Sequence, residues 1–389
     1  MIPSNGRKKA LSAAVGIVAM SLALAGCSEA TPTDTEEQVL KIGFMTPLTG
    51  PATSFGEDAR DGALVAIDVA KEAGLVPGVT FELVIEDDKS TPEIAVVALQ
   101  KLKDEGVNFI TGTVNSSVVV AIASALSGDP DTLYTITGAQ IQEPLDEQSG
   151  ETITGLTHTN AMYAESVLPW IQDEAKPNKV AFMGENSDFG VEELAQLEAA
   201  WSAGTPEIVL KEVFDRTATD FSSILSNVRD SGADSLYIAV ASSTIAASVA
   251  TQAEALGLDL NIFISSGIVT ETLIEAGGET VEGITSGDVY HATIDNPENA
   301  VFVEAFEAKY GETPGPLHAL GYESIMLFVE AMNEAGTTTD VPEIASTLRS
   351  GTWATPRGEL VFDATGRAQT PTMIIRVEDG KIVLVDTVQ

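Results

Sequence analysis

Short apolar runs alternate with longer amphipathic stretches in the first third of the chain. The runs have the length and the Val, Ile, Leu and Phe content of buried strands. The expected strands are 39–45, 81–85, 107–111 and 133–137. Helices are expected over about 54–73, after Thr91-Pro92, which is typical of an N-cap followed by proline, and near Ser116. This alternation predicts a parallel sheet covered by helices on both faces.

A second series of the same kind follows, and the last third is mixed. The second series predicts strands at 179–183, 208–214, 235–240 and 262–265, with helices beginning near Asp188, Thr219 and Ser243. The last third predicts helices at 298–310 and 317–334, a strand at 359–363 and a hairpin over 373–385 that turns at Asp379-Gly380. Two strand–helix series in one chain predict an α/β protein with two Rossmann-like lobes, each built on a parallel central sheet.

The N-terminal residues have the order of a bacterial export signal. Three basic residues precede the apolar stretch 10–25, and small residues then precede Cys27, the only cysteine. Leu24-Ala25-Gly26-Cys27 resembles the lipobox of bacterial lipoproteins, in which the cysteine is lipidated and becomes the new N-terminus. The alternative is a chance cysteine after an ordinary signal peptide. We expect a signal peptide over 1–26, a tether over 27–38 and an extracytoplasmic protein. The lipid on Cys27 would anchor it to the cell membrane, in the periplasm if the host has an outer membrane.

Charge and composition exclude several classes of protein. The chain has 58 acidic and 20 basic residues and a formal charge of −38, so its surface repels nucleic acid, and we expect no nucleic-acid partner. Hydrophobic residues make up 44% of the chain, enough to bury substantial cores. No apolar run after the signal reaches membrane-spanning length, so nothing indicates a transmembrane receptor.

The sequence lacks the motifs of the common enzyme classes. It has no HExxH, no Cys/His cluster, no GxSxG, no P-loop and no GxGxxG. We therefore expect no catalytic residues, no metal and no cofactor. Glu86-Asp87-Asp88 is interpreted as a solvated strand end rather than a metal-binding pair. His158 and His291 fall near predicted lobe crossings and are expected to be surface or hydrogen-bonded hinge histidines.

Several segments in a fixed order carry a resemblance to a known family. They are Ile42 to Pro51, Phe55-Gly56, Asp61-Gly62-Ala63, Glu86-Asp87-Asp88, Gly112 to Ser117, Asp188-Phe189-Gly190 and Thr219 to Ser222. Together they make the chain resemble the type I periplasmic binding proteins of the leucine/isoleucine/valine-binding family, the substrate-capturing subunits of ABC importers. The resemblance runs over nearly all of the chain after the predicted tether.

This resemblance implies two lobes joined by three crossover segments, near 153–160, 283–291 and 357–363. The first lobe would comprise 39–156 and 286–358, and the second 157–285 and 359–389. A small ligand would enter the cleft, favour hinge closure and be delivered to ABC permease subunits. Two alternatives stay open: a lipoprotein of the same fold that senses a ligand for a membrane receptor, and an extracytoplasmic enzyme.

Candidate ligand-binding residues follow the predicted strands, because ligands of open α/β sheets bind beyond the carboxyl ends of the strands. Ser116 and Ser117 would offer hydroxyl and N–H groups at a helix N-terminus, which suits a carboxylate, although one serine could simply cap the helix. The resemblance implies that Phe55 and Phe189 place their rings against the ligand; the alternative is ordinary packing. The remaining candidates are Ala139, Gln140, Ser242 and Ser266.

Two departures from the family pattern leave the ligand open. Ile141 stands where a hydroxyl residue is expected in proteins that bind α-amino acids. The stretch Ser265 to Ile268, with Gly267 at the relevant place, lacks the acid that would pair with the ammonium, and Glu271 could supply it only if the alignment were shifted. Because a buried unpaired ammonium is costly, a carboxylate or amide without that group is an alternative to an amino acid.

Overall fold

The computed structural model describes residues 38–141, 145 and 150–388. The predicted signal peptide, Cys27 and the tether up to its last residue lie outside the described residues. No helix in the described part of the chain has both the length and the apolar character needed to cross a bilayer.

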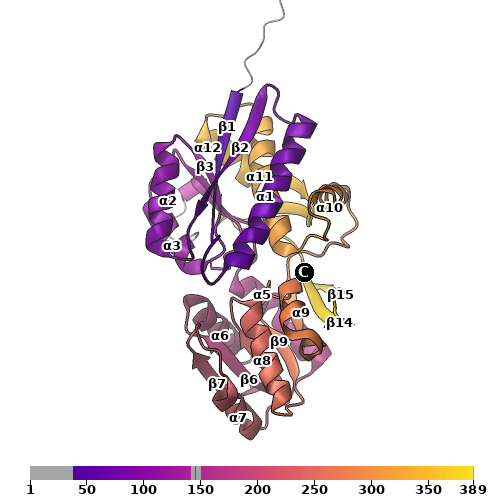
Figure 1. Ribbon diagram of the computed structural model, residues 1–389. Coiled ribbons are helices and arrows are strands. Elements are labelled where there is room, and N and C mark those ends of the chain that lie inside the picture. The colour runs from indigo at the N-terminus through magenta and orange to yellow at the C-terminus, as the bar shows by residue number, and fades with distance from the viewer. Residues whose placement is uncertain (1–37, 142–144, 146–149, 389) are drawn as a thin grey trace, which may run out of the picture. The chain divides into compact units, whose positions relative to one another are not determined.

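A five-stranded parallel sheet forms the centre of the first lobe (Figure 1). Its order is β2-β1-β3-β4-β5, so the chain starts inside the sheet and then extends it in both directions. The strands are β1 (Gln38–Thr46), β2 (Val79–Asp87), β3 (Phe109–Gly112), β4 (Leu133–Ile136) and β5 (Ile153–Gly155). The four predicted strands are thus confirmed, and β5 is added at one edge.

Helices cover both faces of this sheet, as the alternation predicts. Ile42 and Phe44 of β1 share one apolar core with α1 and α11, whereas Met45 faces the other way into a core with α2 and α3. α10 packs beside α1, and α12 beside α11. The helices are α1 (Thr53–Ala73), α2 (Pro92–Asp104), α3 (Ser116–Ala125), α10 (Pro297–Tyr310), α11 (Pro316–Ala335) and α12 (Val341–Ser350). The sequence predicted all of them except α12.

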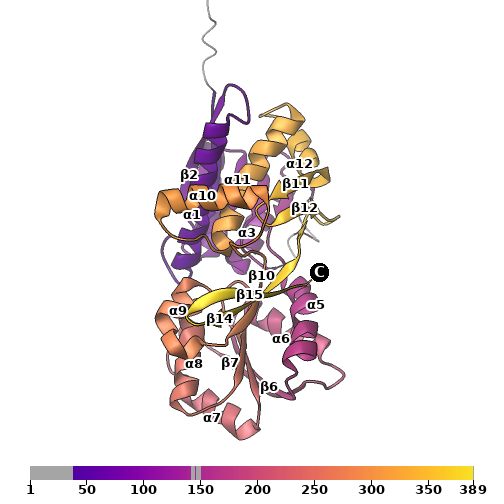
Figure 2. The same ribbon diagram turned by 90° about the vertical axis from the view of Figure 1, so that its right-hand side faces the viewer.

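A seven-stranded sheet of order β15-β14-β10-β9-β8-β6-β7 forms the second lobe (Figure 2). Five strands are parallel, and the C-terminal hairpin β14–β15 adds two antiparallel ones. The strands are β6 (Lys179–Glu185), β7 (Glu207–Phe214), β8 (Ser235–Ala239), β9 (Asn261–Ile264), β10 (Thr285–Asp288), β14 (Thr372–Glu378) and β15 (Lys381–Val388). The predicted hairpin turn is confirmed, since Glu378 pairs with Lys381 around Asp379-Gly380.

The second sheet also has two covered faces. Val180 and Phe182 of β6 pack in the core that holds α5 and α6, and Ala181 and Met183 pack in the core that holds α7 and α8. The helices are α5 (Asn160–Trp170), which continues as a π-helical turn (Ile171–Ala175), α6 (Asp188–Ala200), α7 (Ser222–Ser231), α8 (Ser243–Ala255) and α9 (Glu271–Gly277). The predicted fold class, two Rossmann-like lobes with parallel central sheets, is confirmed.

A small third sheet joins β11 (Thr352–Thr355), β12 (Gly358–Phe362) and β13 (Ala368–Gln369) in antiparallel pairs. Next to β13, Arg367 forms an isolated bridge with Gly155 at the end of β5. The chain therefore passes between the two large sheets three times: after β5, after β10, and between β13 and β14. The numerical lobe boundaries given above stay predictions.

Buried charged side chains hold the crossing segments together. Arg367 is fully buried and donates hydrogen bonds to the carbonyl oxygens of Thr157 (3.0 Å) and Ile141 (2.7 Å). Arg357, also buried, pairs with Glu323 of α11 at 2.8 Å. Burial, together with the charge of Arg357, lowers the pKa of His158 to about 3, so this ring is neutral between Thr370 and Thr372. His158 is thus the hydrogen-bonded hinge histidine that the sequence predicted.

Two glycines let α1 and α11 touch backbone to backbone. A methyl group added at Gly62 would lie 1.9 Å from the carbonyl oxygen of His318, and one at Gly321 would lie 2.0 Å from that of Ala59. No side chain fits at either distance. This contact fixes the first turns of both helices, which supply Phe55 and Leu317 to the cavity described below.

We predict that Gly321→Ala destabilises the protein. Alanine stabilises a helix by about 1 kcal/mol relative to glycine. The overpacking penalty is typically 1–3 kcal/mol, and we expect it to dominate because this backbone contact cannot relax. Urea unfolding followed by circular dichroism measures the change. Gly315→Ala is the matched control, because its new methyl would meet its nearest neighbour at 3.6 Å. Equal stability of both variants would contradict the close packing of the two helices.

Candidate functional site

One cavity lies where the carboxyl ends of both large sheets meet. It has a volume of about 380 Å³ and is lined by residues that follow β1, β3, β4 and β5 in the first lobe and β6, β7, β8, β9 and β10 in the second. The first turns of α1, α3, α6 and α11 also contribute. This is the position at which parallel α/β sheets bind ligands, because the loops there converge.

Six of the eight candidate residues line this cavity. They are Phe55, Ser116, Ser117, Gln140, Phe189 and Ser266. Ala139 does not line it, because its side chain is buried in the core with α2 and α3. Ser242 does not line it either: its hydroxyl caps α8 by accepting a hydrogen bond from the N–H of Ile245, and its neighbour Ala241 faces the cavity instead. A ligand contact by any of these residues stays a prediction.

The N-terminus of α3 is open toward the cavity. Val118 and Val119 donate their N–H groups to the carbonyl oxygen of Asn115, whose side chain does not cap the helix. Within the described residues, the N–H groups of Ser116 and Ser117 and their hydroxyls make no hydrogen bond. These four donors lie at the positive end of the helix dipole, so the arrangement suits a carboxylate.

Two aromatic side chains lie at the first turns of helices in different lobes. Phe55 belongs to α1 of the first lobe, yet it packs against the apolar core of the second. Phe189 belongs to α6, whose start is fixed by Ser187 accepting a hydrogen bond from Gly190. Val114, Leu317, Leu320 and Ile268 add further apolar surface to the cavity. The cavity therefore offers an apolar middle next to a polar end.

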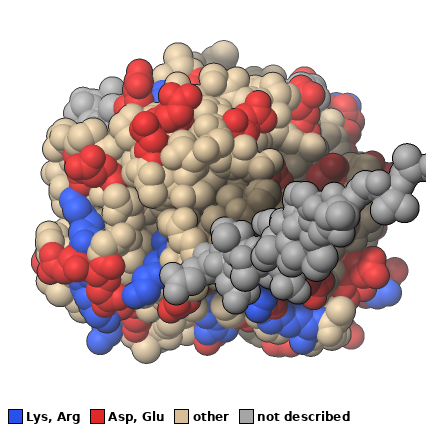
Figure 3. All heavy atoms as spheres, turned by 90° about the horizontal axis from the view of Figure 1, so that it is seen from above, with Lys and Arg blue, Asp and Glu red and all other residues tan. Residues whose placement is uncertain are grey.

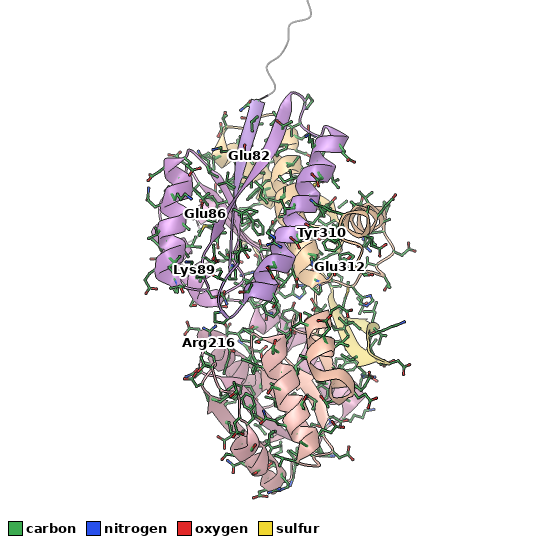
Figure 4. The ribbon with its side chains drawn as sticks, viewed as in Figure 1. Glu82, Glu86, Lys89, Arg216, Tyr310 and Glu312 are labelled. Atoms are coloured by element: carbon green, nitrogen blue, oxygen red, sulfur yellow. The ribbon has the colours of Figure 1, made fainter. Side chains whose placement is uncertain are left out.

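The cavity also contains charged residues that the sequence analysis did not single out. Glu185 ends β6 and is satisfied, because its two oxygens accept hydrogen bonds from Ser187 and from the N–H of Ala241. Arg216, on the loop after β7 (Figure 4), is the only Lys or Arg among the described residues that line the cavity. Asp188 is exposed at the start of α6. Each of these residues lies at or shortly after the end of a strand, and this position is the feature of the sequence from which it could have been predicted.

Asp288 is the most unusual of these groups. It is fully buried at the end of β10, and its Oδ1 accepts a hydrogen bond from the N–H of Val289 at 2.7 Å. Its burial raises the pKa to about 7, although backbone N–H groups and the charge of Arg357 act in the opposite direction. Glu271, the acid that a shifted alignment would bring in, is exposed on α9 and does not line the cavity.

One hydrogen bond joins the two lobes directly at the cavity. The Gln140 side chain, from the loop after β4, donates through Nε2 to the carbonyl oxygen of Ser266, after β9, at 2.9 Å. Gly267 next to it has φ +83°, a conformation that favours glycine. Ile141, where the family pattern has a hydroxyl, is buried and offers no polar side chain.

The acidic run at the end of β2 has a structural role outside the cavity. Oδ1 of Asp87 accepts hydrogen bonds from the N–H groups of Leu48 and Lys89, so this carboxylate holds the β1–α1 loop. Glu86 pairs with Lys101 on the surface; Glu86 and Lys89 are labelled in Figure 4.

The described residues contain no group of three or more His, Cys, Asp or Glu arranged to hold a metal ion. Figure 3 shows acidic and basic side chains interspersed over the visible face.

Comparison with known proteins identifies the family. The sequence profile of the periplasmic binding protein family matches residues 39–381, so the chain belongs to this family. Its fold is that of the type I members.

The relatives are solute-binding proteins rather than enzymes. The leucine-, isoleucine-, valine-, threonine- and alanine-binding protein of Pseudomonas aeruginosa is 25% identical over 84% of this chain and 86% of its own length. The Leu/Ile/Val-binding protein of Escherichia coli K12 is 23% identical over 84% and 87%. The leucine-binding protein LivK of Thermotoga maritima superposes with a TM-score of 0.82 at 25% identity, over 90% of this chain and 98% of its own. A Rhodopseudomonas palustris solute-binding protein in complex with benzoate gives 0.82 at 21% identity, over 90% and 96%.

We predict that the protein becomes less stable between pH 5 and pH 8. Burial raises the pKa of Glu193, on α6, to about 8, even though Ser265 donates a hydrogen bond to it. The folded protein therefore retains a proton that the unfolded chain releases above about pH 4.5, and stability falls as pH rises, by at most about 1.4 kcal/mol per pH unit for one group. Urea unfolding at a series of pH values measures the slope.

Glu193→Gln should reduce that slope, because glutamine does not titrate and can still accept the hydrogen bond from Ser265. Glu198→Gln, at an exposed position on the same helix, is the control. An unchanged pH dependence in Glu193→Gln would contradict a buried, protonated Glu193.

Proposed function

We propose that this protein is the lipid-anchored substrate-binding protein of an ABC importer, and that it captures a small carboxylic acid by closing its two lobes. The ligand would be an amino acid or a related small acid or amide. Contacts with residues of both lobes would favour the closed state, since only that state offers all of them together. The loaded protein would then dock on the permease subunits.

The observation that carries this proposal is the open N-terminus of α3 inside a cavity shared by both lobes. Four unbonded donors of Ser116 and Ser117 would hold the carboxylate. Phe55 from the first lobe and Phe189 from the second would pack on the carbon skeleton. One carboxylate clamp with apolar packing is enough for a micromolar site, which corresponds to about 8 kcal/mol.

The relatives support an acid as the ligand class. The P. aeruginosa and E. coli proteins are both named for leucine, isoleucine and valine, the former also for threonine and alanine, and the R. palustris neighbour was solved with benzoate. All these compounds have a carboxylate and an apolar part, which matches the two kinds of surface in this cavity.

We predict that a panel of small acids contains a ligand, and that Ser117→Ala weakens its binding. The panel pairs branched-chain and aromatic amino acids with their deaminated acids and amides, and polyols serve as compounds without a carboxylate. Thermal shift identifies the ligand and calorimetry measures its affinity. Losing one hydrogen bond to a charged group should reduce the affinity about tenfold or more. Ser242→Ala, outside the cavity, is the control.

If no acid in the panel binds, or if Ser117→Ala binds as tightly as the wild type, the carboxylate site is elsewhere. Uptake of the identified ligand by cells that lack the gene would separate transport from sensing: a transport component is required for uptake, and a sensor is not.

We predict that Cys27→Ala releases the protein from the membrane. Without the thiol no lipid can be attached, and the rest of the chain is highly acidic, so anionic lipid should not retain it. Cell fractionation followed by immunoblotting measures the distribution, and mass spectrometry of the N-terminal peptide detects the lipid. Ser28→Ala is the control. A Cys27→Ala protein that stays with the membrane would contradict the anchor.

A further inference from the structure

Three buried acceptor atoms of residues that line the cavity have no hydrogen-bond partner within the described part of the chain. One is Oδ1 of Asn115, directly before α3, and the other two are Oδ2 of Asp288 and Oε1 of Gln140. Of these three side chains, those of Asp288 and Gln140 are at least nine-tenths buried. Since buried polar groups are nearly always hydrogen-bonded, two such atoms at one cavity point to a partner that comes from outside the chain.

The two residues lie at one corner of the cavity. Gln140 donates to the carbonyl oxygen of Ser266 at 2.9 Å. The next residue, Gly267, donates its N–H to the carbonyl oxygen of Gly287 at 3.2 Å, and Asp288 follows Gly287 directly. A methyl group added at Gly287 would lie 2.9 Å from Oγ of Ser266, so these segments are in contact.

The neighbouring charged groups among the described residues do not supply the missing hydrogen bond to Oδ2 of Asp288. Glu185, the other buried acid of the cavity, has both oxygens bonded. Arg357 contributes a favourable charge to Asp288, yet its guanidinium is engaged with Glu323 and Thr370. The buried phenol of Tyr163 is also near, and its pKa is raised far above the ordinary value, first by burial and then by the charge of Asp288, so it stays neutral.

We propose that Asp288 and Gln140 bind the ammonium group of the ligand, which makes the substrate a small amino acid rather than a deaminated acid. This inference rests on the proposed function, because the carboxylate of the same ligand would lie at Ser116 and Ser117. An ammonium group has three donors and a positive charge. It therefore satisfies both orphan acceptors and neutralises the buried carboxylate.

The proposal also explains why the second lobe can lack an acid after β9. Ser266 and Gly267 occupy that place, and Asp288 on the adjacent strand β10 supplies the carboxylate instead. Gln140 comes from the first lobe and Asp288 from the second sheet, so one ammonium group would tie the two lobes together when the cleft is closed.

Matched ligand pairs test the proposal. The probes are L-leucine with 4-methylpentanoate and L-phenylalanine with 3-phenylpropanoate, each measured by calorimetry on the mature chain. We expect the wild type to bind an amino acid at least tenfold more tightly than its deaminated partner. Asp288→Asn has the same shape but presents a neutral amide, so it should lose that preference and leave the deaminated acid unaffected.

Glu271→Gln is the control, because Glu271 is an exposed acid that does not line the cavity, so this variant should keep the preference. If Asp288→Asn does not fold, Gln140→Met removes the other acceptor and should reduce the preference as well. The role of Asp288 would be overturned if the wild type bound an amino acid and its deaminated partner equally well. It would also be overturned if the folded variants kept the wild-type preference for the amino acid. In either case the proposed function would stand. Binding of neither partner would count against a small amino acid, and only a panel with no bound acid at all would overturn the proposed function.

Discussion

Everything at this site depends on one geometrical constraint: parallel strands of a sheet end at the same edge. In both lobes the carboxyl ends of the strands face the same cavity, so each loop that leaves a strand adds a side chain to it. The donors of Ser116 and Ser117 follow β3, Gln140 follows β4 and Asp288 ends β10. None of these positions is near another in sequence, and only the sheet order brings them together.

The three chain crossings add a second constraint. Arg367, next to β13, donates hydrogen bonds to the carbonyl oxygens of Thr157 in the first crossing and of Ile141 after β4. Arg357, before β12, pairs with Glu323 of α11. Charges buried this completely are costly unless they are paired, and breaking such a pair is far more destabilising than the pair is stabilising. These contacts stabilise the crossing segments, whereas the cavity itself holds polar groups without partners among the described residues. The proposed closure around a ligand would change backbone dihedral angles at a few residues of the crossings.

The sequence predicted most of the fold because apolar runs mark buried parallel strands. It missed β11 and the edges of β12, whose alternate residues are exposed, and it missed β10, whose residues Thr285 to Asp288 include no large apolar side chain. Helix α12 was missed although Asp340 and Pro342 give it a typical start. Its cap could have been found from sequence.

The cavity was predictable only in part, for physical reasons. Ser116, Gln140 and Ser266 were found because they follow recognisable strands. Ser242 also follows a strand, but its hydroxyl is used to cap α8. Asp288 was not found, since nothing in its own sequence shows that tertiary packing removes it from water and leaves one oxygen without a partner.

The central claim is that one ligand contacts both lobes and brings them together. Cysteines for spin labels can be introduced at two exposed positions, Glu93 of α2 and Ala195 of α6, in a chain with Cys27 replaced by serine. Pulsed electron paramagnetic resonance then measures the distance between the two lobes. The account predicts that a saturating ligand shifts the distance distribution to shorter values. An unchanged distribution, with binding confirmed by calorimetry on the same labelled protein, would contradict it.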